Sequence, residues 1–361
     1  MSSAIPAAPP GPEHVPSVAP GDRPLISVVV KCLNEERNLA RCLHSILAAT
    51  AGYATEIIVA DAGSRDRSVE IAAGFAVQIV QFENPAERNC GATAQLGWQF
   101  ATGDHVLLVD GDMELLPDFL PAALTALRDD SSLGGVGGKL NEMSDAMEFQ
   151  ERLRRSPLRV PRDVACVTGC GLYRAEAIRG AGYFMDRNLH CFEELDLGGR
   201  LRSAGWRLRL LDVDCVRHYG HHEVAFRLLR NRWRARTLDG YGEFLRGALG
   251  SRRWRDALRT SRYALFTIAW WAILSILILA MLWSPVFVWP LLAIAALPMA
   301  ALLLRKRRLD RAAYALVMWQ FAGASLIRGL AARRIEPRTK LRAIVVHEPG
   351  RGRLTAPRRN A

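Results

Sequence analysis

Short apolar runs alternate with amphipathic stretches along the first part of the chain. Four runs are bounded by turn residues and are typical of buried strands, at 26–30, 56–60, 77–81 and 105–109. The stretches between them carry apolar side chains at helical spacing, at 35–49, 67–74 and 87–101. This alternation predicts an α/β fold with a mainly parallel sheet and helices on both faces.

Two longer apolar runs, 263–283 and 286–304, follow near the C-terminal end. Each is close to the ~20 residues that a helix needs to cross a bilayer. Both are apolar on all sides, and tryptophans such as Trp283 and Trp289 suit a membrane interface. A buried helical hairpin of a soluble core is the alternative. We expect a transmembrane hairpin over 263–304.

The chain carries a formal net charge of +12, which by itself would suit nucleic acid. Much of the excess lies at 227–262 and after residue 305, beside the two apolar runs, and no nucleic-acid recognition motif is present. Anionic lipid headgroups therefore explain the charge better, and we expect membrane lipids and no nucleic acid as partners. The positive flanks place both ends of the hairpin on the cytoplasmic side of the inner membrane.

The remaining segments complete the predicted organisation. Residues 1–24 are rich in Pro, Ala, Gly and Ser without the apolar core of a signal peptide, which indicates a disordered lead. A catalytic domain over 25–225 and basic interfacial helices over 226–262 should precede the hairpin. Residues 305–361 should form a basic cytosolic tail, with an interfacial or re-entrant helix near 312–327. Seven cysteines without zinc-type spacing indicate reduced thiols in a cytosolic domain.

Two carboxylates, Asp110 and Asp112, follow the apolar run 106–109. In extended backbone, alternate side chains share a face, so both carboxylates can point at one divalent cation at a strand's carboxyl end. Open α/β sheets bind their ligands at that end, and such cations fill their remaining positions with substrate phosphates. A solvated acidic turn is the alternative.

Polar clusters also follow the first and second predicted strands, at 31–36 and 61–66. Neither is a phosphate-binding loop of the Walker type or a dinucleotide fingerprint. Asp61 could accept hydrogen bonds from a base or ribose, and Gly63 would allow close approach of the backbone. Alternatively, Glu35 and Glu36 complement a helix dipole and 61–64 is a turn with a helix cap.

Five blocks in this order resemble the nucleotide-sugar-binding half of family 2 glycosyltransferases of GT-A fold. They are 26–41 with Asn34-Glu35-Glu36, 57–66 with Asp61-x-Gly63-Ser64, Arg88-Asn89-x-Gly91, Gly103-Asp104 and Asp110-x-Asp112. The resemblance implies a GT-A (Rossmann-like) domain that binds a UDP-, GDP- or dTDP-sugar. It implies donor-binding roles for Asn34, Glu35, Asp61, Gly63, Arg88, Asn89 and Asp110, with Mg2+ or Mn2+ held by Asp110 and Asp112. Ala62 stands where the family often has a second Asp, and Lys31 where it often has Pro.

The second half of the domain should supply the acceptor side and a base. The segment 167–174 resembles the family's glycine-bearing acceptor segment, which implies acceptor-side positions for Gly169, Gly171 and Arg174; a tight strand bend is the alternative.

The block Glu193-Glu194-Leu195-Asp196-Leu197 resembles the family's Glu-Asp-x-Asp-Leu motif, whose second acidic residue is the general base. This resemblance makes Glu194 the base and Asp196 the second choice. Repulsion from Glu193 would raise one pKa of the acidic pair. An exposed acidic helix start that pairs with Arg200 and Arg202 is the alternative.

His218 follows a strand-like segment, and a neutral imidazole there could complete a metal shell or touch a departing diphosphate; a solvated loop is the alternative. The resemblance implies an inverting, metal-dependent transfer of a sugar to an acceptor hydroxyl. The nearby hairpin suggests a lipid-linked or envelope glycan acceptor. A nucleotidyltransferase would be expected to have a glycine-rich triphosphate loop, but 31–34 contains no glycine. A membrane-tethered scaffold without activity stays open.

Overall fold

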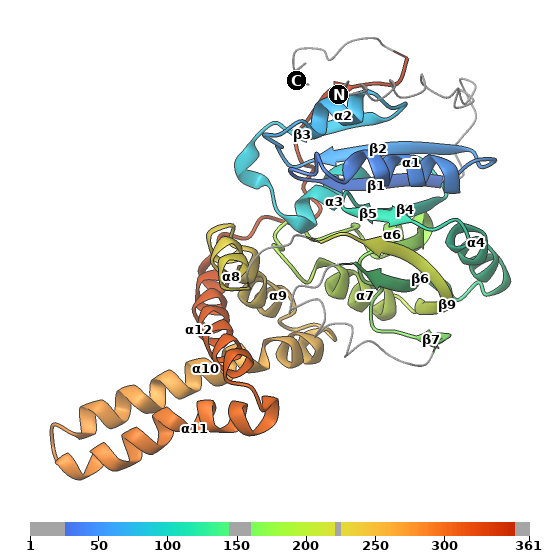
Figure 1. The fold of residues 1–361 in the computed structure, drawn as a ribbon. Coiled ribbons are helices and arrows are strands. Elements are labelled where there is room, and N and C mark those ends of the chain that lie inside the picture. Colours follow the sequence, from blue (N-terminus) through green and yellow to red (C-terminus); the bar gives the residue numbers. More distant parts are fainter. Residues whose placement is uncertain (1–25, 144–159, 221–224, 351–361) are drawn as a thin grey trace, which may run out of the picture.

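The computed structural model describes residues 26–143, 160–220 and 225–350, so the predicted lead 1–24 and the end of the tail lie outside the described residues. The described part holds a ten-stranded sheet in the order β10-β3-β2-β1-β4-β8-β6-β9-β5, with β7 paired to β9 (Figure 1). The strands are β1 Ile26–Cys32, β2 Thr55–Asp61, β3 Gln78–Phe82, β4 His105–Asp110, β5 Met113–Leu115, β6 Leu133–Glu142, β7 Arg162–Asp163, β8 Gly171–Arg174, β9 Arg207–His218 and β10 Ala343–His347.

Helices cover both faces of this sheet. The helices of the domain are α1 Leu39–Ala49, α2 Ser68–Ala73, η1 Pro85–Glu87, α3 Cys90–Trp98, α4 Phe119–Asp129, α6 Ala175–Gly180 and α7 Glu193–Ser203. Because side chains alternate along a strand, Val28 and Val30 pack with α1 and α4 while Val29 packs with α3, α6 and α7. The predicted α/β class is confirmed.

The carboxyl ends of the parallel strands meet at one edge of the sheet. Strands β3, β2, β1 and β4 run parallel, with β1 between β2 and β4. Strand β8 returns antiparallel beside β4 and brings Gly171 opposite Leu108. Residues that follow β1, β2 and β4 therefore converge with the segment before β8, as expected for a site at the end of an open sheet.

A helical module follows the sheet domain. Its helices are α8 Ala225–Arg234, η2 Thr237–Asp239, α9 Gly240–Gly247, α10 Trp254–Ala280, η3 Pro285–Phe287, α11 Val288–Lys306 and α12 Leu309–Ala331. In the described residues two helical stretches, Trp254–Ala280 and Pro285–Lys306, are long and apolar enough to cross a membrane. They form a hairpin that projects from the rest of the molecule (Figure 1), with Trp283 at its turn 91% exposed. The structure thus has the helices expected of a transmembrane hairpin.

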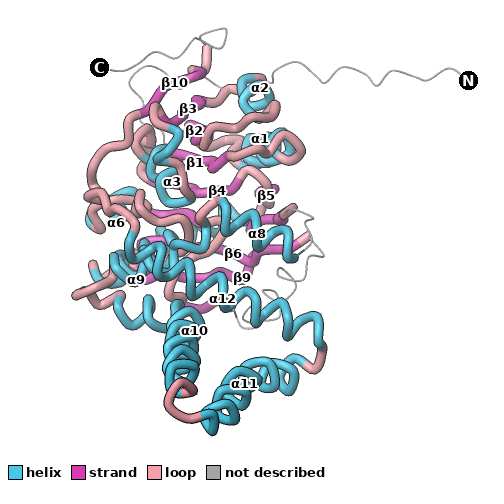
Figure 2. The backbone as a smooth tube through the Cα atoms, turned by 90° about the vertical axis from the view of Figure 1, so that its left-hand side faces the viewer, coloured by secondary structure: helices cyan, strands magenta, loops and turns pink. Residues whose placement is uncertain are grey.

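The segment predicted as a basic tail is more closely tied to the domain than expected. Helix α12 packs on α9, α10 and α11, and Gly329 lies so close to α9 that a Cβ atom there would overlap the carbonyl of Asp239. The chain then crosses the domain, and β10 pairs antiparallel with β3 (Figure 2). Because β10 extends the sheet, part of the predicted tail belongs to the sheet domain.

Candidate active site

Lys31 and Asp110 are lateral neighbours at the carboxyl end of the sheet. They pair in register across β1 and β4, and the Lys31 ammonium lies 2.9 Å from the Asp110 Oδ1. The next residue, Gly111, donates its N–H to the Lys31 carbonyl at 2.8 Å. A Cβ atom on Gly111 would lie 3.1 Å from that carbonyl, so a glycine lets the turn between the two carboxylates close against β1.

The loops after β1 and β2 are joined by reciprocal hydrogen bonds. The Asn34 N–H donates to the Ser64 Oγ at 2.8 Å, and the Asn34 Oδ1 accepts from the Arg65 N–H at 2.8 Å. Two residues on, the Glu36 N–H donates to Asp66. Asn34 has a left-handed backbone, which asparagine tolerates better than most residues. The predicted donor-site residue Asn34 therefore shapes the floor of the site in this structure.

Asp61 is almost fully bonded by its own turn. Its Oδ2 accepts from the backbone N–H groups of Gly63 and Ser64 and from the Gln81 amide, and its Oδ1 accepts from the Ser64 hydroxyl. Gly63 has φ +86°, and a Cβ atom there would lie 3.6 Å from the Arg88 guanidinium. The turn-and-cap alternative thus describes the geometry of Asp61, while Gly63 and Arg88 lie together as expected of one pocket wall.

Asp112 lies in the turn just before β5, and β5 pairs with β9 so that Asp112 faces His218. The His218 Nε2 lies 3.1 Å from the Asp112 Oδ2, and its Nδ1 lies 2.8 Å from the Glu142 carboxylate, which is fully buried. Burial lowers the pKa of His218, but bonding and charge attraction from Asp112 and Glu142 outweigh it and raise the pKa to about 9. The structure thus brings Asp112 and His218 together as predicted and adds Glu142 behind the imidazole.

A divalent cation fits the chemistry of this edge. Asp110 and Asp112 offer carboxylate oxygens, and a histidine held by a second carboxylate is the usual arrangement of a metal-binding imidazole. Burial, and after it the charges of Asp112 and Asp110, raise the pKa of Glu35 to about 8. No three His, Cys, Asp or Glu side chains among the described residues already stand in metal-ligand geometry. The Asp110 Oδ1 faces the Lys31 ammonium, so a cation would compete with Lys31 for Asp110.

The Lys31 ammonium also reaches the acidic pair at the start of α7. It lies 3.4 Å from the Glu193 Oε1, and the Lys31 side chain is only 13% exposed. Burial lowers the pKa of Lys31, but Asp110 and Glu193 outweigh it and hold the pKa well above its usual value. We call the carboxyl ends of β1, β2 and β4, with Asp61, Asp110 and Asp112, the donor edge. The Lys31 ammonium therefore joins this donor edge to the predicted catalytic residues at the start of α7.

Glu194 has the properties expected of a general base. Its Oε1 accepts the Gly169 N–H at 2.7 Å, and the side chain is partly exposed. Burial and the charge of Glu193 raise the pKa of Glu194 to about 7, although Lys31 lowers it. Gly169 has φ +80°, so a larger residue would strain the turn that donates to Glu194. The glycine segment before β8 and the acidic block are thus in contact.

Asp196, the second choice for the base, has a structural position. It is 1% exposed, its Oδ2 bonds the Arg200 Nε at 2.7 Å, and its Oδ1 bonds Arg253. With both oxygens held by arginines, Asp196 is not placed to take a proton from an acceptor. Asp196 thus pairs with Arg200 as the alternative of an acidic helix start expects, but it is buried rather than exposed, and Arg202 pairs with Asp256 instead. These contacts do not favour Asp196 as the base, and Glu194 stays the proposed base.

Two further predicted residues also have structural roles. Asn89 caps α3 by accepting the Ala92 N–H, and its amide donates to the Arg187 carbonyl at 2.8 Å. Arg174 pairs in register with His105 at the start of β4, and its guanidinium donates to the Leu133 carbonyl. Since His105 lies at the opposite end of β4 from Asp110, the structure places Arg174 away from the site, contrary to the acceptor-side expectation.

Gly171, the other acceptor-side glycine, lies close to the site. A Cβ atom there would lie 2.7 Å from the Val167 side chain, so the bend before β8 needs a glycine. This tight bend is the structural alternative, and the same bend presents Gly169 to Glu194.

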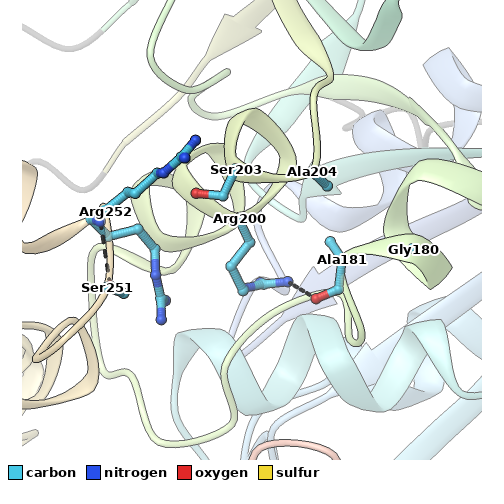
Figure 3. Close-up of a pocket in the computed structure, with 8 residues that line it drawn as sticks. Gly180, Ala181, Arg200, Ser203, Ala204, Ser251 and Arg252 are labelled. Carbon is cyan, nitrogen blue, oxygen red and sulfur yellow. Dashed lines mark hydrogen bonds between the residues drawn. The ribbon is translucent and has the colours of Figure 1, made fainter.

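A cavity of about 440 Å3 lies at the other end of α7, lined by Gly180, Ala181, Arg200, Ser203, Ala204, Ser251, Arg252 and Arg253 (Figure 3). Within its lining, Arg200 donates to the Ala181 carbonyl at 3.4 Å (Figure 3). Both Arg200 and Arg253 also bond Asp196. The site at the sheet edge, at the start of α7, is therefore separate from this cavity.

Sequence reasoning missed three residues that complete the site. Lys31 was noted only as a departure from the family pattern, although its place at the end of the first strand puts it beside Asp110. Glu142 and Gln81 lie at or near the ends of β6 and β3 and hold His218 and Asp61. No local motif marks either partner, because each contact depends on how distant strands are ordered in the sheet.

Comparisons with known proteins agree with this geometry. Residues 27–179 match the family described as "Glycosyl transferase family 2". The "Undecaprenyl-phosphate 4-deoxy-4-formamido-L-arabinose transferase" of Pseudomonas paraeruginosa is 36% identical over 107 residues, 27% of this chain and 30% of that protein. The "Uncharacterized glycosyltransferase YibD" of Escherichia coli (strain K12) is 34% identical over 108 residues, 29% of this chain and 31% of that protein. The chain thus spans about a third of the length of these curated relatives.

A solved structure shows the same fold over most of the molecule. It is the mannosyltransferase PcManGT from Pyrobaculum calidifontis in complex with GDP-Man and Mn2+, with a TM-score of 0.53 and 19% identity. The similarity covers 87% of this chain and 90% of that one. Residues 27–179 therefore form a domain of the kind that the glycosyl transferase family 2 model describes, and the sheet domain has a GT-A-like fold.

Proposed function

We propose that the protein transfers a sugar from a nucleoside-diphosphate donor to an acceptor hydroxyl, with a divalent cation at Asp112 and inversion at the anomeric carbon. One observation carries the proposal. The buried ammonium of Lys31 joins the donor-side carboxylate Asp110 to Glu193, next to the candidate base Glu194. A phosphate-binding edge and a proton acceptor thus lie on opposite sides of one small site, as a single displacement requires.

The chain's own residues account for the proton and for the leaving group. The Gly169 N–H donates to the Oε1 of Glu194. The Oε2 of Glu194 is left to take up the proton of the attacking hydroxyl. As the acceptor oxygen bonds to the anomeric carbon, the bond to the diphosphate breaks and its electron pair leaves with the diphosphate. A cation bound at Asp110, Asp112 and His218 would neutralise the charge that develops on that diphosphate.

The donor and acceptor classes follow from the relatives and from the helical module. A fold neighbour holds GDP-Man and Mn2+, and a relative is named for undecaprenyl-phosphate. In this chain the base-bearing segment contacts the module, because Glu243 of α9 accepts hydrogen bonds from the His190 N–H at 3.0 Å and from its ring. We therefore propose a nucleotide-sugar donor and a lipid-linked or envelope glycan acceptor reached from the membrane.

A screen of donor hydrolysis by the purified protein tests the function. UDP-, GDP- and dTDP-sugars are incubated with and without Mn2+ or Mg2+, and the released nucleoside diphosphate is measured. We expect metal-dependent release from one nucleotide class and no turnover by the Glu194→Gln variant. If no nucleoside diphosphate is released and none binds with metal by calorimetry, the chain is an inactive tethered scaffold and the proposal fails.

The membrane arrangement has its own test. We propose that the α10–α11 hairpin spans the inner membrane with both basic flanks in the cytoplasm. Ser284 lies in the hairpin turn, so a Ser284→Cys variant should react with a membrane-impermeant maleimide added outside spheroplasts. The unsubstituted protein in the same spheroplasts is the control for its native cysteines. Labelling of Ser284→Cys only after lysis would contradict this topology.

A further inference from the structure

Lys31 has a place in the site that the proposed reaction does not yet use. Its ammonium contacts Asp110 at 2.9 Å and Glu193 at 3.4 Å, and these two carboxylates come from β4 and α7, 83 positions apart in the sequence. Both partners of Lys31 are largely shielded, since the exposed fractions of the Asp110 and Glu193 side chains are 31% and 8%. Lys31 is therefore the direct link between the two sides of the site.

The backbone fixes the contact between Lys31 and Asp110. The two residues are register partners across β1 and β4, so their side chains leave the sheet side by side on the same face. The Gly111 N–H, which bonds the Lys31 carbonyl, prevents the two strand ends from separating. An ammonium that is held in this way competes directly with any cation for Asp110.

The charges around Lys31 show what its removal would do. Asp110, Glu193 and Glu194 act on the ammonium, and Cys90 at the start of α3 lies near it. Without Lys31, two largely shielded carboxylates would lose their shared positive partner and the edge would become more negative. A divalent cation should then bind more tightly even without a nucleotide.

We propose that Lys31 is a positioning residue that holds Asp110 away from the metal until a donor diphosphate arrives, and that sets the position of Glu193 beside the base. This proposal rests on the proposed function, because it assumes a metal-bound diphosphate at Asp112. The arriving phosphates bring negative charge that attracts both cations, so the metal binds together with the nucleotide. Asp110 is then released to the metal, and Lys31 retains Glu193 and faces the diphosphate.

Mn2+ binding, measured from the electron paramagnetic resonance signal of free Mn2+, tests this proposal. The full-length protein in detergent is compared with Lys31→Met, which keeps the length of the side chain, and Lys31→Arg, which keeps the charge. Each is titrated with Mn2+ alone and with Mn2+ plus GDP or UDP. We expect Lys31→Met to bind Mn2+ alone at least about tenfold more tightly than the unsubstituted protein, and to hydrolyse donor at least about tenfold more slowly. Lys31→Arg should keep weak binding of Mn2+ alone.

Tighter Mn2+ binding together with slower donor hydrolysis separates the proposal from a loss of folding, because a misfolded variant would lose both Mn2+ binding and hydrolysis. Unchanged or weaker binding of Mn2+ alone by Lys31→Met overturns the proposal. In that case, tight binding of Mn2+ by the unsubstituted protein in the presence of nucleotide would still leave the proposed function intact. If no variant binds Mn2+ even with nucleotide, the proposed metal site itself fails. Should Lys31→Met not fold, Glu193→Gln gives a second test. In this variant Lys31 keeps only Asp110 as its carboxylate partner. The affinity of the Glu193→Gln variant for Mn2+ without nucleotide should therefore fall, and a rise would overturn the proposal.

Discussion

The donor edge of the sheet and the start of α7 both carry buried or partly buried carboxylates, but they hold them differently. At the donor edge Asp61 accepts four hydrogen bonds, Asp110 has Lys31 and Asp112 has His218. At the start of α7, Glu194 has one hydrogen bond from Gly169 and, within the described residues, no ion pair. Burial and the charge of Glu193 raise the pKa of Glu194 to about 7. At the donor edge Asp61, Asp110 and Asp112 each have partners that stabilise a carboxylate, whereas Glu194 has an open oxygen and a raised pKa, as a proton acceptor requires.

The same difference appears within α7 itself. Asp196 lies two residues after Glu194, on the same helix, yet it is held by Arg200 and Arg253. A carboxylate whose oxygens are all bonded maintains structure, whereas a carboxylate with an open oxygen and a raised pKa can do chemistry. The contrast between Glu194 and Asp196 therefore supports the proposed role of Glu194 as the base, which the acidic motif alone left open.

The most damaging single change should be Glu194→Gln. The amide keeps the size of the side chain and can still accept from Gly169, but it cannot take up a proton. Because a general base contributes about 10²–10⁴-fold, we expect kcat for donor turnover to fall by about a thousandfold. Calorimetric binding of the nucleoside diphosphate should not change. Retained turnover would move the base to another group and remove the contrast with Asp196.

The matched variant Asp196→Asn should affect stability instead. It leaves Arg200 and Arg253 buried without their carboxylate, and breaking a buried ion pair in this way costs about 3–5 kcal/mol. We expect a clearly lower melting temperature in detergent, measured by differential scanning fluorimetry. Below that melting temperature, kcat should stay within a few-fold of the unsubstituted protein. A large loss of kcat at unchanged melting temperature would give Asp196 a catalytic role.

Much of the fold and part of the site could be predicted from the sequence. The strand and helix pattern predicted β1 to β4, because buried strands and amphipathic helices depend on local periodicity. The sequence suggested Asp112 and His218 as ligands of one metal, and the structure brings these two side chains into direct contact. The contacts of Lys31 with Glu193, of Arg174 with Leu133, and of β10 with β3 were not predicted, because they depend on the order of strands in the sheet and on where α7 packs against it. Local patterns carry no information on that order.

Asp112→Asn tests the donor edge. The amide has one charge fewer, binds a divalent cation poorly, and leaves His218 with Glu142 as its one remaining carboxylate partner among those the structure describes. Since the loss of one electrostatic stabiliser costs about 10²–10³-fold, we expect donor turnover to fall about a hundredfold. Added Mn2+ should no longer increase turnover. Turnover that still rises with Mn2+ would place the metal elsewhere.

The pH dependence of kcat/KM tests the raised pKa of Glu194. The base must be deprotonated, and its pKa of about 7 in the protein without metal means that the base becomes active as the pH rises through that value. Below the pKa, kcat/KM should fall about tenfold for each pH unit. The measurement uses donor hydrolysis at saturating Mn2+. The positive charge of bound Mn2+ can lower the pKa of Glu194 but not raise it, so the loss of activity at acid pH should begin at or below pH 7. A flat profile between pH 5 and 8 would show that Glu194 does not titrate during turnover.

The smallest effect is expected from Ser64→Ala at the donor edge. The Ser64 hydroxyl donates to Asp61 at 2.5 Å and accepts from the Asn34 N–H at 2.8 Å, so it joins the loops after β1 and β2. Asp61 keeps its three other bonds, and the loops keep the bond from Arg65 to Asn34, so we expect a loss of about 1 kcal/mol in stability. The melting temperature should fall slightly, and nucleoside diphosphate affinity should weaken by no more than a few-fold. A large loss of nucleotide affinity at nearly unchanged melting temperature would mean that Ser64 or Asp61 contacts the nucleotide directly, and that the donor edge does more than hold charge in place.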